Sequence, residues 1–389
     1  MKILVVAPGV PNQFHRIRLN HIIHALGENN KISGCYLNIG HPIAKQKMAG
    51  AHIEQKSPIQ SIIDSLFFLL LPQPLEVSYC HSPSLKNKVG LLSRSHDIIL
   101  VKRLRALQYI PRDTNKPVLI DSTDAMSLFY QKAKDSVSWW QKPLYFEEWI
   151  KYLIYEKWAS KKYKNWVVCS EDDASYLKRV LSPGTHVWVV PNVVDTSYYK
   201  EKSPSREKTI LFSGLMEKHV NQSAAYFFLE KIYPKIKKVV PAVKLYIVGP
   251  NPPSKLISYQ KDKSITVTGK VEDIRTYIDF ASVVVTPTLI GTGMRNKILQ
   301  ALSHNRPVVT TTLGAQGLSP EIKKILFIAD SPKSFAQNTI SLLTNEGLRK
   351  KMAKKGRALI KKHYSLPIMR QKYNEVLHSV VLNEQDHKK

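Results

Sequence analysis

The chain has 389 residues, too many for one small core and enough for two domains of ordinary size. Hydrophobic residues make up 43% of it, which excludes a disordered or low-complexity protein. With 58 Lys and Arg against 30 Asp and Glu, the formal net charge is +28. This excess favours an anionic partner, such as nucleic acid, phosphorylated small molecules or an acidic membrane surface, unless the lysines only solubilise the surface.

The cysteines and the most apolar run indicate in which cellular compartment the protein is expected. Cys35, Cys80 and Cys169 are far apart and form no C-x-x-C pair, so neither a disulfide framework nor a zinc site is expected. The N-terminus lacks the pattern of a signal peptide. Residues 62–72 are strongly apolar but include Asp64 and are too short to span a bilayer. We interpret this run as a core helix and expect a cytoplasmic protein that is soluble or peripheral.

Short apolar runs alternate with helical patterns, which is typical of parallel sheets with crossover helices. The first helix is expected to run from residue 17 to near Gly27. Strands in the first half are expected at residues 2–8, 97–101, 117–121, 166–170 and 187–190. The pattern then restarts, with strands expected at residues 209–214, 244–249, 265–269, 282–287, 307–311 and 325–330. This order predicts two doubly wound α/β halves in series, with ligands at the carboxyl ends of the strands.

A polar, proline-containing segment separates the two halves. We predict a first domain over residues 1–190, a linker over 191–208 and a second domain over 209–364. Residues 365–389 are predicted to form a C-terminal helix that packs back towards the first domain.

Residues 139–166 combine aromatic and basic side chains. Trp149, Leu153 and Trp158 recur at helical spacing, with lysines between them. Such a helix either packs within the domain with one solvated face, or rests with a basic, aromatic-rimmed surface on acidic lipid. The pattern leaves both interpretations open.

The loop after the first strand, residues 8–18, is placed to face a ligand. It holds one glycine, so the dinucleotide fingerprint G-x-G-x-x-G is absent and NAD binding is disfavoured. Arg16 and Arg18 could bind a phosphate or an acceptor carboxylate, or could be surface charges.

The stretch DSTD follows another predicted strand of the first half. Asp121 or Asp124 could orient a hydroxyl or stabilise positive charge building on a sugar carbon. Each could instead cap the following helix. No P-loop, H-E-x-x-H or D-x-D motif is present, so a metal site is not expected.

Residues 286–311 join a strand, a glycine loop and a helix. The backbone N–H groups from Gly291 to Met294 are expected at a positive helix end, which suits a diphosphate. The glycines permit close approach, and Arg295 or Lys297 can add charge. Gln300 lies two turns along, where it could reach ribose hydroxyls.

These motifs occur in order along nearly the whole chain. The second half contains SGLMEKHVNQSAA, YIVGPNP, TGKVED and TPTLIGTGMRNKILQALSHNRPVVTT, and the first half contains DSTDAMS, YEKWA, CSEDD and VPNVVD. This pattern resembles glycosyltransferase family 4, and more narrowly the bacterial sugar transferases associated with exopolysaccharide and exosortase systems.

The resemblance implies an α/β GT-B fold, in which two Rossmann-like doubly wound domains face a central cleft. It further implies a retaining, metal-independent enzyme without a cofactor that uses a UDP- or GDP-linked sugar. The first domain would bind a glycan or lipid-linked acceptor, and the product would be a cell-surface polysaccharide. Contact with an anionic membrane would make the protein peripheral at the inner face of the cell membrane.

The resemblance assigns the roles of the family's motif residues to the matching residues of this chain. Gly291, Thr292, Gly293 and Met294 would hold the diphosphate and sugar. Lys270 and Val271 would flank the base, and Gly214 would line the cleft. With Arg295 and Gln300 these form the candidate donor-binding set. The catalytic candidates are Asp121, Asp124 and Lys297, and the acceptor-binding candidates are Arg16 and Arg18.

The chain also departs from the family pattern. Thr292 and Gln300 stand where the family often has two glutamates, although the first is commonly glycine in this subgroup. Leu215 and Asn221 stand where many members have Arg and Lys. Lys297, Arg295 or Lys218 must then compensate, or the diphosphate is held weakly. We predict that Lys297 compensates, the alternative being a surface lysine. A second hypothesis follows, a catalytically weakened glycosyltransferase-like binding subunit. Nucleic acid is not expected as a partner, because no binding motif is present and the charge is spread over both halves.

Overall fold

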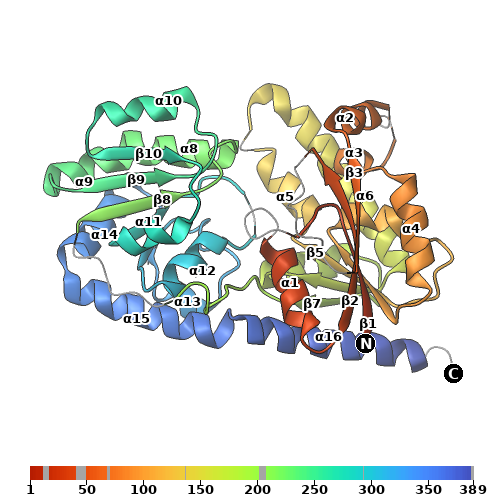
Figure 1. Ribbon diagram of the computed structural model, residues 1–389. Coiled ribbons are helices and arrows are strands. Elements are labelled where there is room, and N and C mark those ends of the chain that lie inside the picture. Colours follow the sequence, from red (N-terminus) through yellow and green to blue (C-terminus); the bar gives the residue numbers. More distant parts are fainter. Residues whose placement is uncertain are drawn as a thin grey trace. The chain divides into compact units, whose positions relative to one another are not determined.

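The computed structural model describes residues 1–11, 17–40, 50–67, 71–135, 137–200, 207–291 and 293–386. The chain divides into two compact units (Figure 1). Unit 1 comprises residues 1–191 together with 369–389, and unit 2 comprises residues 192–368. Unit 1 is therefore built from both ends of the chain.

In the described part of unit 1, a seven-stranded parallel sheet has the order β3-β2-β1-β4-β5-β6-β7. Its strands are β1 (Lys2–Ala7), β2 (Lys31–Ile39), β3 (Ala51–Lys56), β4 (Ile98–Lys102), β5 (Val118–Thr123), β6 (Asn165–Val168) and β7 (His186–Val189). Residues 3–7 of β1 are all buried, as expected for a central strand covered on both faces.

Helices pack against this sheet, with α1 and α4 on opposite sides of it in Figure 1. The helices of this part of the chain are α1 (Ile17–Gly27), α2 (Pro58–Phe67), α3 (Leu75–Tyr79), α4 (Pro83–Ser93), η1 (Leu104–Tyr109), α5 (Met126–Ala133), η2 (Trp139–Gln141), α6 (Lys142–Lys162) and α7 (Glu171–Val180). The final helix, α16 (Leu366–Asp386), contributes to unit 1 from residue 369 onward.

The described part of unit 2 holds a six-stranded parallel sheet in the order β10-β9-β8-β11-β12-β13. Its strands are β8 (Thr209–Ser213), β9 (Lys244–Val248), β10 (Ile265–Gly269), β11 (Val283–Thr286), β12 (Val308–Thr310) and β13 (Phe327–Ile328). Its helices are α8 (His219–Phe227), η3 (Phe228–Ile232), α9 (Tyr233–Val239), α10 (Ser254–Ile257), η4 (Ser258–Lys261), α11 (Ile274–Phe280), α12 (Asn296–Ser303), α13 (Pro320–Lys323), α14 (Pro332–Thr344) and α15 (Glu346–His363).

Both sheets reverse their winding once. In unit 1 the reversal lies between β1 and β4, and in unit 2 between β8 and β11. Loops leave the carboxyl ends of two neighbouring strands in opposite directions at such a switch point, and the crevice between them is the usual ligand site of a doubly wound sheet. Each unit therefore presents one switch point where functional residues are expected.

Every strand predicted from the sequence is present, and the predicted doubly wound α/β class is confirmed for both units. Two strands of unit 1, β2 and β3, were not predicted. The predicted core helix at residues 62–72 is wrong for its described part, because α2 turns its apolar side chains to solvent. Residues 68–70 of that run lie outside the described residues.

Residues 192–200, predicted as linker, belong to unit 2, where Tyr199 is buried. Within the described residues, no helix combines the length and apolarity needed to cross a membrane.

Candidate functional site

The glycine loop lies at the switch point of unit 2. It follows β11 and leads into α12, which begins at Asn296, more than a turn later than the sequence predicted. Gly291 has φ +115° and Gly293 has φ +78°. Side chains with a Cβ rarely adopt these conformations, so both positions require glycine. Thr292, between them, lies outside the described residues.

Arg295 and Met294 frame this loop. A Cβ placed on Gly291 would lie 2.9 Å from Nη2 of Arg295, so the guanidinium rests against the loop backbone. Met294 is buried, which anchors the loop in the unit instead of exposing its side chain. A positive charge therefore stands beside Gly291, an arrangement that suits a diphosphate.

Lys297 spans the switch point from α12 to the end of β8. Its Nζ donates to the carbonyl oxygen of Ser213 at 2.9 Å and to Oδ1 of Asn221 at 3.4 Å. The ammonium also lies 5.4 Å from the centre of the Phe212 ring. Because both oxygens are neutral, the positive charge of Lys297 is solvated by these contacts but not cancelled.

The surroundings of Lys297 disfavour its protonated, charged form. Burial, followed by the nearby charge of Arg295, lowers the pKa of Lys297 to about 8. A bound anion would oppose both effects and favour the protonated form. At neutral pH the lysine therefore keeps most of its charge, and a bound phosphate would stabilise that charge further.

Glycines bring the ends of β8 and β9 close together. A Cβ on Gly249 would stand 1.6 Å from the carbonyl oxygen of Gly214, and one on Gly214 would stand 2.8 Å from Cγ of Asn221. Asn221 in turn donates to the carbonyl oxygen of Leu215 at 3.0 Å. The ends of β8 and β9 therefore pack too closely for a larger residue at Gly249, and at Gly214 the Asn221 side chain leaves little room for one.

Lys270 and Val271, the predicted base-flanking pair, directly follow β10. The amide of Gly249 donates to the carbonyl oxygen of Gly269 at 3.1 Å, which joins the ends of β9 and β10. Lys270 is exposed and Val271 half-buried. Both therefore lie at the same edge of the sheet as Gly214, two strands away from it.

Gln300 lies on α12 but is already engaged. Its Nε2 donates to the hydroxyl of Tyr199 at 2.9 Å. The carbonyl oxygen of Tyr199 accepts from Ser303 at 3.0 Å and from Arg357 at 2.9 Å, so the tyrosine is held from several sides. In this structure the Gln300 amide positions Tyr199, and its role towards a ribose stays a prediction.

The switch point of unit 1 is occupied by a buried charge network. The Asp121 carboxylate, fully buried, pairs with Arg18 at 3.0 Å and with Lys102 at 2.9 Å. The hydroxyl of Tyr373 on α16 also donates to Asp121, and Thr123 donates to it at 3.2 Å. We call these five residues the Asp121 network.

The Asp121 network sets the charges of its own members. Burial would raise the pKa of Asp121, but the charges of Arg18 and Lys102 and the hydrogen bond from Tyr373 outweigh it and hold that pKa well below its usual range. Burial lowers the pKa of Lys102, with Asp121 opposing and the charge of Arg18 adding to the shift. The Asp121 carboxylate is ionised because Arg18, Lys102 and Tyr373 are buried beside it and stabilise its charge.

This placement differs from the roles predicted for Asp121 and Arg18. Asp121 was predicted to act on a substrate or to cap a helix, and Arg18 to bind an acceptor or to be a surface charge. In the structure each is buried and paired with the other. Arg16, the other predicted acceptor residue, lies outside the described residues. Thr123 has a strained backbone, with φ +72° beside an irregularity in the pairing of β5 with β6.

Asp124, which follows β5 in the same unit, is a carboxylate that is partly exposed to solvent. It pairs with Arg103 at 3.2 Å and accepts from Cys169 at 3.4 Å. Oxygens of Asp124 and Asp173 and the sulfur of Cys169 lie within 4.8 Å of one another, close enough for a metal. Asp173, however, already accepts from the amide of Ala125 at 3.0 Å, so its carboxylate serves the backbone.

Comparison with known proteins supports a function for the second unit. Residues 207–345 match the family model described as glycosyl transferases group 1. The match lies within unit 2 and covers about a third of the chain, so unit 2 is similar to this family. The chain is 22% identical over 288 residues to an uncharacterized 44.6 kDa protein in the cps region of Klebsiella pneumoniae, a match that covers 70% of this chain and 72% of that one.

Two solved structures extend the likeness to both units. Sucrose-phosphate synthase from Thermosynechococcus elongatus aligns with a TM-score of 0.72 at 13% identity, covering 98% of this chain and 99% of that one. Anabaena HepE in complex with UDP and glucose aligns with a TM-score of 0.66 at 14% identity, covering 97% and 100%. These likenesses show the fold, so the predicted GT-B class is confirmed. Together with the family model they support a glycosyltransferase.

Three residues that contact the candidate residues of the two units were missed from the sequence. Lys102 is the last residue of a buried strand, Tyr373 lies 252 positions after Asp121, and Tyr199 fell in the predicted linker. A lysine closing an otherwise apolar strand was a usable signal, because an unpaired charge there would be costly. No local pattern could have indicated the other two.

Proposed function

We propose that the protein is a retaining, metal-independent glycosyltransferase of family 4 that transfers a sugar from a UDP- or GDP-linked donor to a glycan or lipid-linked acceptor. The product would be a cell-surface polysaccharide, and the enzyme would act in the cytoplasm. The observation that carries the proposal is the loop of Gly291 and Gly293, flanked by Arg295 and Lys297, at the switch point of a group 1 glycosyltransferase unit. The UDP complex of HepE and the cps-region relative favour the donor and the product.

The chemistry follows from the two cations. As the bond between sugar and diphosphate lengthens, negative charge grows on the leaving phosphate, and fixed positive charge lowers that barrier. Lys297 and Arg295 can supply that charge from the chain itself. The glycines let the phosphate oxygens approach the backbone. On this proposal no metal or other cofactor is needed, and neither a metal nor nucleic acid is a partner.

The test is release of free nucleotide. The purified chain is incubated with UDP- or GDP-sugars and a panel of lipid-linked and soluble glycans, with and without EDTA. We expect UDP or GDP release that depends on both donor and acceptor and survives EDTA, with the donor's anomeric configuration kept in the product by NMR. Loss of activity with EDTA, or an inverted product, would overturn the corresponding part of the proposal.

A matched pair of variants ties the activity to the loop. Lys297→Ala is expected to lose most of the activity, whereas Lys333→Ala, which removes an exposed lysine on α14 of the same unit, should retain it. Equal activity in the two variants would remove Lys297 from the mechanism.

A second candidate is a binding subunit that has lost turnover. It is favoured by the neutral Leu215 and Asn221 beside Lys297 and by the engagement of Gln300 with Tyr199. Calorimetric binding of a nucleotide-sugar without nucleotide release, across the acceptor panel, would support this candidate over the enzyme.

A further inference from the structure

Two residues of unit 1 have a strained backbone at the ends of neighbouring strands. Arg103, directly after β4, has φ +69° and ψ 136°, and Thr123, the last residue of β5, has φ +72°. Such angles are strained for an arginine and for a β-branched threonine. The amide of Arg103 donates to the carbonyl oxygen of Asp121 at 2.8 Å, so the strained turn is tied to β5. The strain therefore lies at the carboxyl edge of the sheet, beside the switch point.

An ion pair of partly exposed side chains lies at this strained edge. The guanidinium of Arg103 pairs with Asp124 at 3.2 Å, and the two side chains are exposed by 35% and 22%. In the adjoining Asp121 network, by contrast, the Asp121 carboxylate is fully buried. Backbone strain beside an exposed charged pair is more typical of a ligand site than of a packed core.

A second ion pair adjoins the first through η1. Arg105, two residues after Arg103, pairs with Glu76 of α3 at 2.6 Å. Burial would raise the pKa of Glu76, but the charges of Arg105 and Arg103 and a hydrogen bond from Tyr152 outweigh it and lower that pKa. Because the charge of Arg103 acts on Glu76 as well as on Asp124, the two ion pairs are neighbours. We call Glu76, Arg103, Arg105 and Asp124 the paired-charge cluster.

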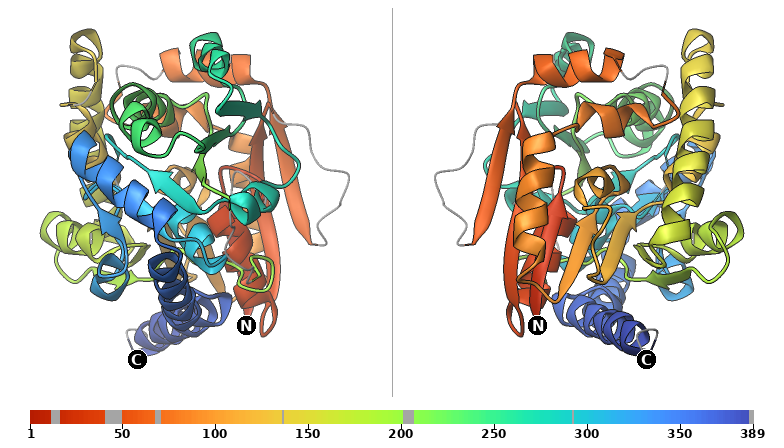
Figure 2. Two further views of the ribbon diagram at one scale, coloured as in Figure 1. Left: turned by 90° about the vertical axis from the view of Figure 1, so that its left-hand side faces the viewer. Right: turned by 90° about the vertical axis from the view of Figure 1, so that its right-hand side faces the viewer.

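The paired-charge cluster keeps one acceptor atom open. Arg105 and the hydroxyl of Tyr152 both donate to Oε2 of Glu76, at 2.6 and 3.1 Å. Within the described part of the chain no group donates to Oε1 of Glu76, whose side chain is 39% exposed. Tyr152 lies on α6, the long yellow helix of Figure 2, and its ring stacks on Tyr130 with the ring centroids 5.3 Å apart. An ionised carboxylate oxygen is therefore open to solvent beside guanidinium N–H groups and tyrosine rings.

Charge decides what kind of ligand the paired-charge cluster suits. Each guanidinium is matched by a carboxylate, so the cluster has no excess positive charge to offer a phosphate. A phosphate would also be repelled by the carboxylates of Glu76 and Asp124. Adjacent hydroxyls of a sugar each donate one hydrogen bond and can accept another. A carboxylate oxygen beside a guanidinium presents the complementary acceptor and donors, and hydrogen bonds to charged groups are the stronger ones.

We propose that the paired-charge cluster binds a neutral sugar of the acceptor, with Glu76 and Asp124 accepting from adjacent hydroxyls and Arg103 donating to the hydroxyl oxygens. Arg103 is then a specificity-determining residue of unit 1, held in place by its strained turn and by Asp124. The inference rests on the proposed function and deepens it. It assigns the contact with this edge of unit 1 to a sugar and not to a phosphate of the acceptor.

The experiment follows binding to the full chain by saturation-transfer NMR. The probes are the methyl glycosides of glucose, galactose, mannose and N-acetylglucosamine, with inorganic phosphate and pyrophosphate as competitors. We expect at least one glycoside to bind and neither anion to displace it. Arg103→Gln and Glu76→Gln should each weaken glycoside binding roughly tenfold or more, because a hydrogen bond to a charged group is lost.

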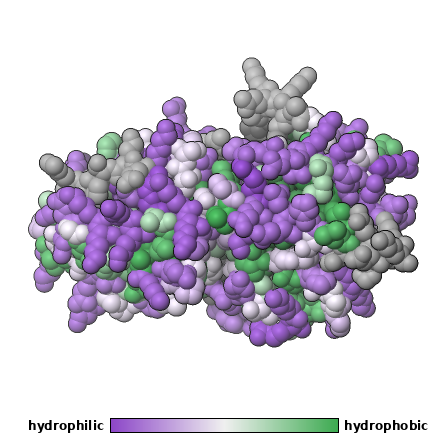
Figure 3. All heavy atoms as spheres, turned by 90° about the horizontal axis from the view of Figure 1, so that it is seen from below, coloured by the Kyte–Doolittle hydropathy of each residue, from purple (hydrophilic) through white to green (hydrophobic). Residues whose placement is uncertain are grey.

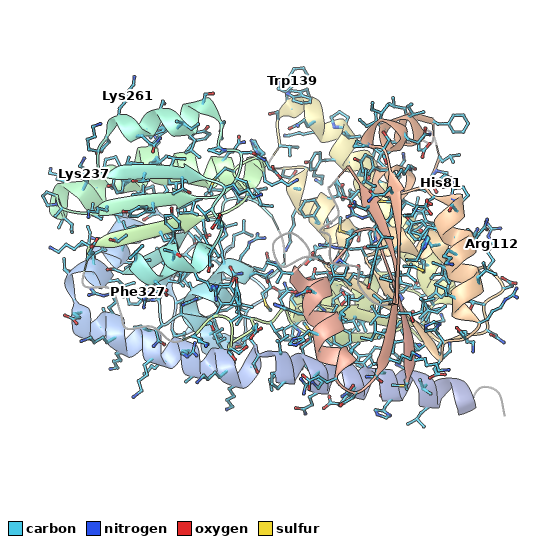
Figure 4. The ribbon with its side chains drawn as sticks, in the orientation of Figure 1. His81, Arg112, Trp139, Lys237, Lys261 and Phe327 are labelled. Atoms are coloured by element: carbon cyan, nitrogen blue, oxygen red, sulfur yellow. The ribbon has the colours of Figure 1, made fainter. Side chains whose placement is uncertain are left out.

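Matched controls change charged residues of unit 1 outside the paired-charge cluster. Arg112, at the periphery of unit 1 in Figure 4, is exposed. Glu28 is paired with Arg370 of α16, a helix on the mostly hydrophilic face shown in Figure 3. Arg112→Gln and Glu28→Gln should bind the glycosides like the unchanged chain.

UDP binding and the midpoint of thermal unfolding are measured in every variant. UDP binding reports separately on unit 2, so failure of the donor proposal and failure of the sugar proposal are distinguishable. If Glu76→Gln lowers the midpoint so far that the chain is unfolded, the partly exposed Arg103 still provides the test. The proposal is overturned if no glycoside binds the unchanged chain, if both cluster variants bind glycosides like the controls, or if phosphate displaces the bound glycoside.

Discussion

The two units share one winding pattern but use its switch point in opposite ways. In unit 1 the crevice edge between β1 and β4 is filled by the Asp121 network, in which Arg18 and Lys102 meet a fully buried carboxylate. In unit 2 the edge between β8 and β11 holds Lys297 against neutral oxygens and two glycines with positive φ. A cation at a switch point therefore indicates a ligand only when the fold does not itself supply the anion.

The difference has an energetic basis. Two desolvated cations beside one carboxylate are tolerated because they are mutually compensated, and removing one partner leaves an uncompensated charge. A half-buried cation beside another cation and without a carboxylate is less stable, and the lowered pKa of Lys297 expresses that cost. The unsatisfied charge in unit 2 is the one available to a phosphate.

Asp121→Asn removes the carboxylate of the Asp121 network in unit 1 and should have the largest effect, a loss of stability. Without the carboxylate, Arg18 and Lys102 are buried like charges, and the free energy of unfolding should fall by about 3–5 kcal/mol. Urea denaturation of the full chain measures this. The pKa of Asp121 is lowered in the fold, so its stabilisation should be present above the ordinary range of a carboxyl and decline as the pH falls below it. An unchanged midpoint would mean that the network contributes no stability.

Lys297→Ala tests whether the switch point of unit 2 binds the diphosphate of a nucleotide. It should weaken UDP or GDP binding roughly 10- to 100-fold, because a charge-assisted contact to the diphosphate is lost, and should leave uridine or guanosine binding nearly unchanged. Calorimetry of the nucleotide and nucleoside pairs separates the two contributions. Equal losses for both members of a pair would contradict a role at the phosphate.

The pH dependence of nucleotide binding sharpens the same point. Because the pKa of Lys297 is lowered to about 8, the free site loses its charge as pH rises through that value. UDP affinity should then fall by up to about tenfold per pH unit until the pKa of the bound form is reached. The decline should be absent in Lys297→Ala and unaltered in Lys333→Ala. A flat profile from about pH 7 to about pH 9 in the unchanged chain would mean that Lys297 keeps its proton throughout.

Gln300→Glu should have the smallest effect. The new carboxylate can accept from the Tyr199 hydroxyl, so the contact is kept with its direction reversed. We expect UDP-sugar affinity to be preserved or to rise by about 1 kcal/mol through a charged acceptor for ribose. A clear loss of affinity, measured by calorimetry, would show that Gln300 serves Tyr199 and not the donor.

Continuous apolar strands were readable from the sequence, whereas pairing partners were not. The runs that form β1, β4 and β11 are buried along their whole length or nearly so, and such runs predict central parallel strands. β2 contains Ser33 and Gly34, which interrupt its apolar pattern. It is a strand because its backbone pairs with β1, a contact that periodicity does not encode.

The sequence also did not indicate the direction in which the apolar face of α2 points. The spacing of Ile59, Ile62 and Ile63 indicated an apolar helix face, but not that this face would point away from the core. At the site, the glycine loop and Lys297 were predicted together because they are neighbours in sequence. The contact of Lys297 with Asn221 depends on the fold, and so does the neutralisation of Arg18 by Asp121.

The contribution of Tyr373 to the Asp121 network bears on how the protein is made. A ribosome delivers residues 1–191 first, yet the hydroxyl that completes their most buried charge cluster lies on α16, near the end of the chain. Unit 2 is contiguous and has all its residues by position 368. The first-synthesised part of unit 1 is therefore completed after unit 2, and Asp121 of a nascent chain lacks the Tyr373 hydroxyl until residue 373 has been added.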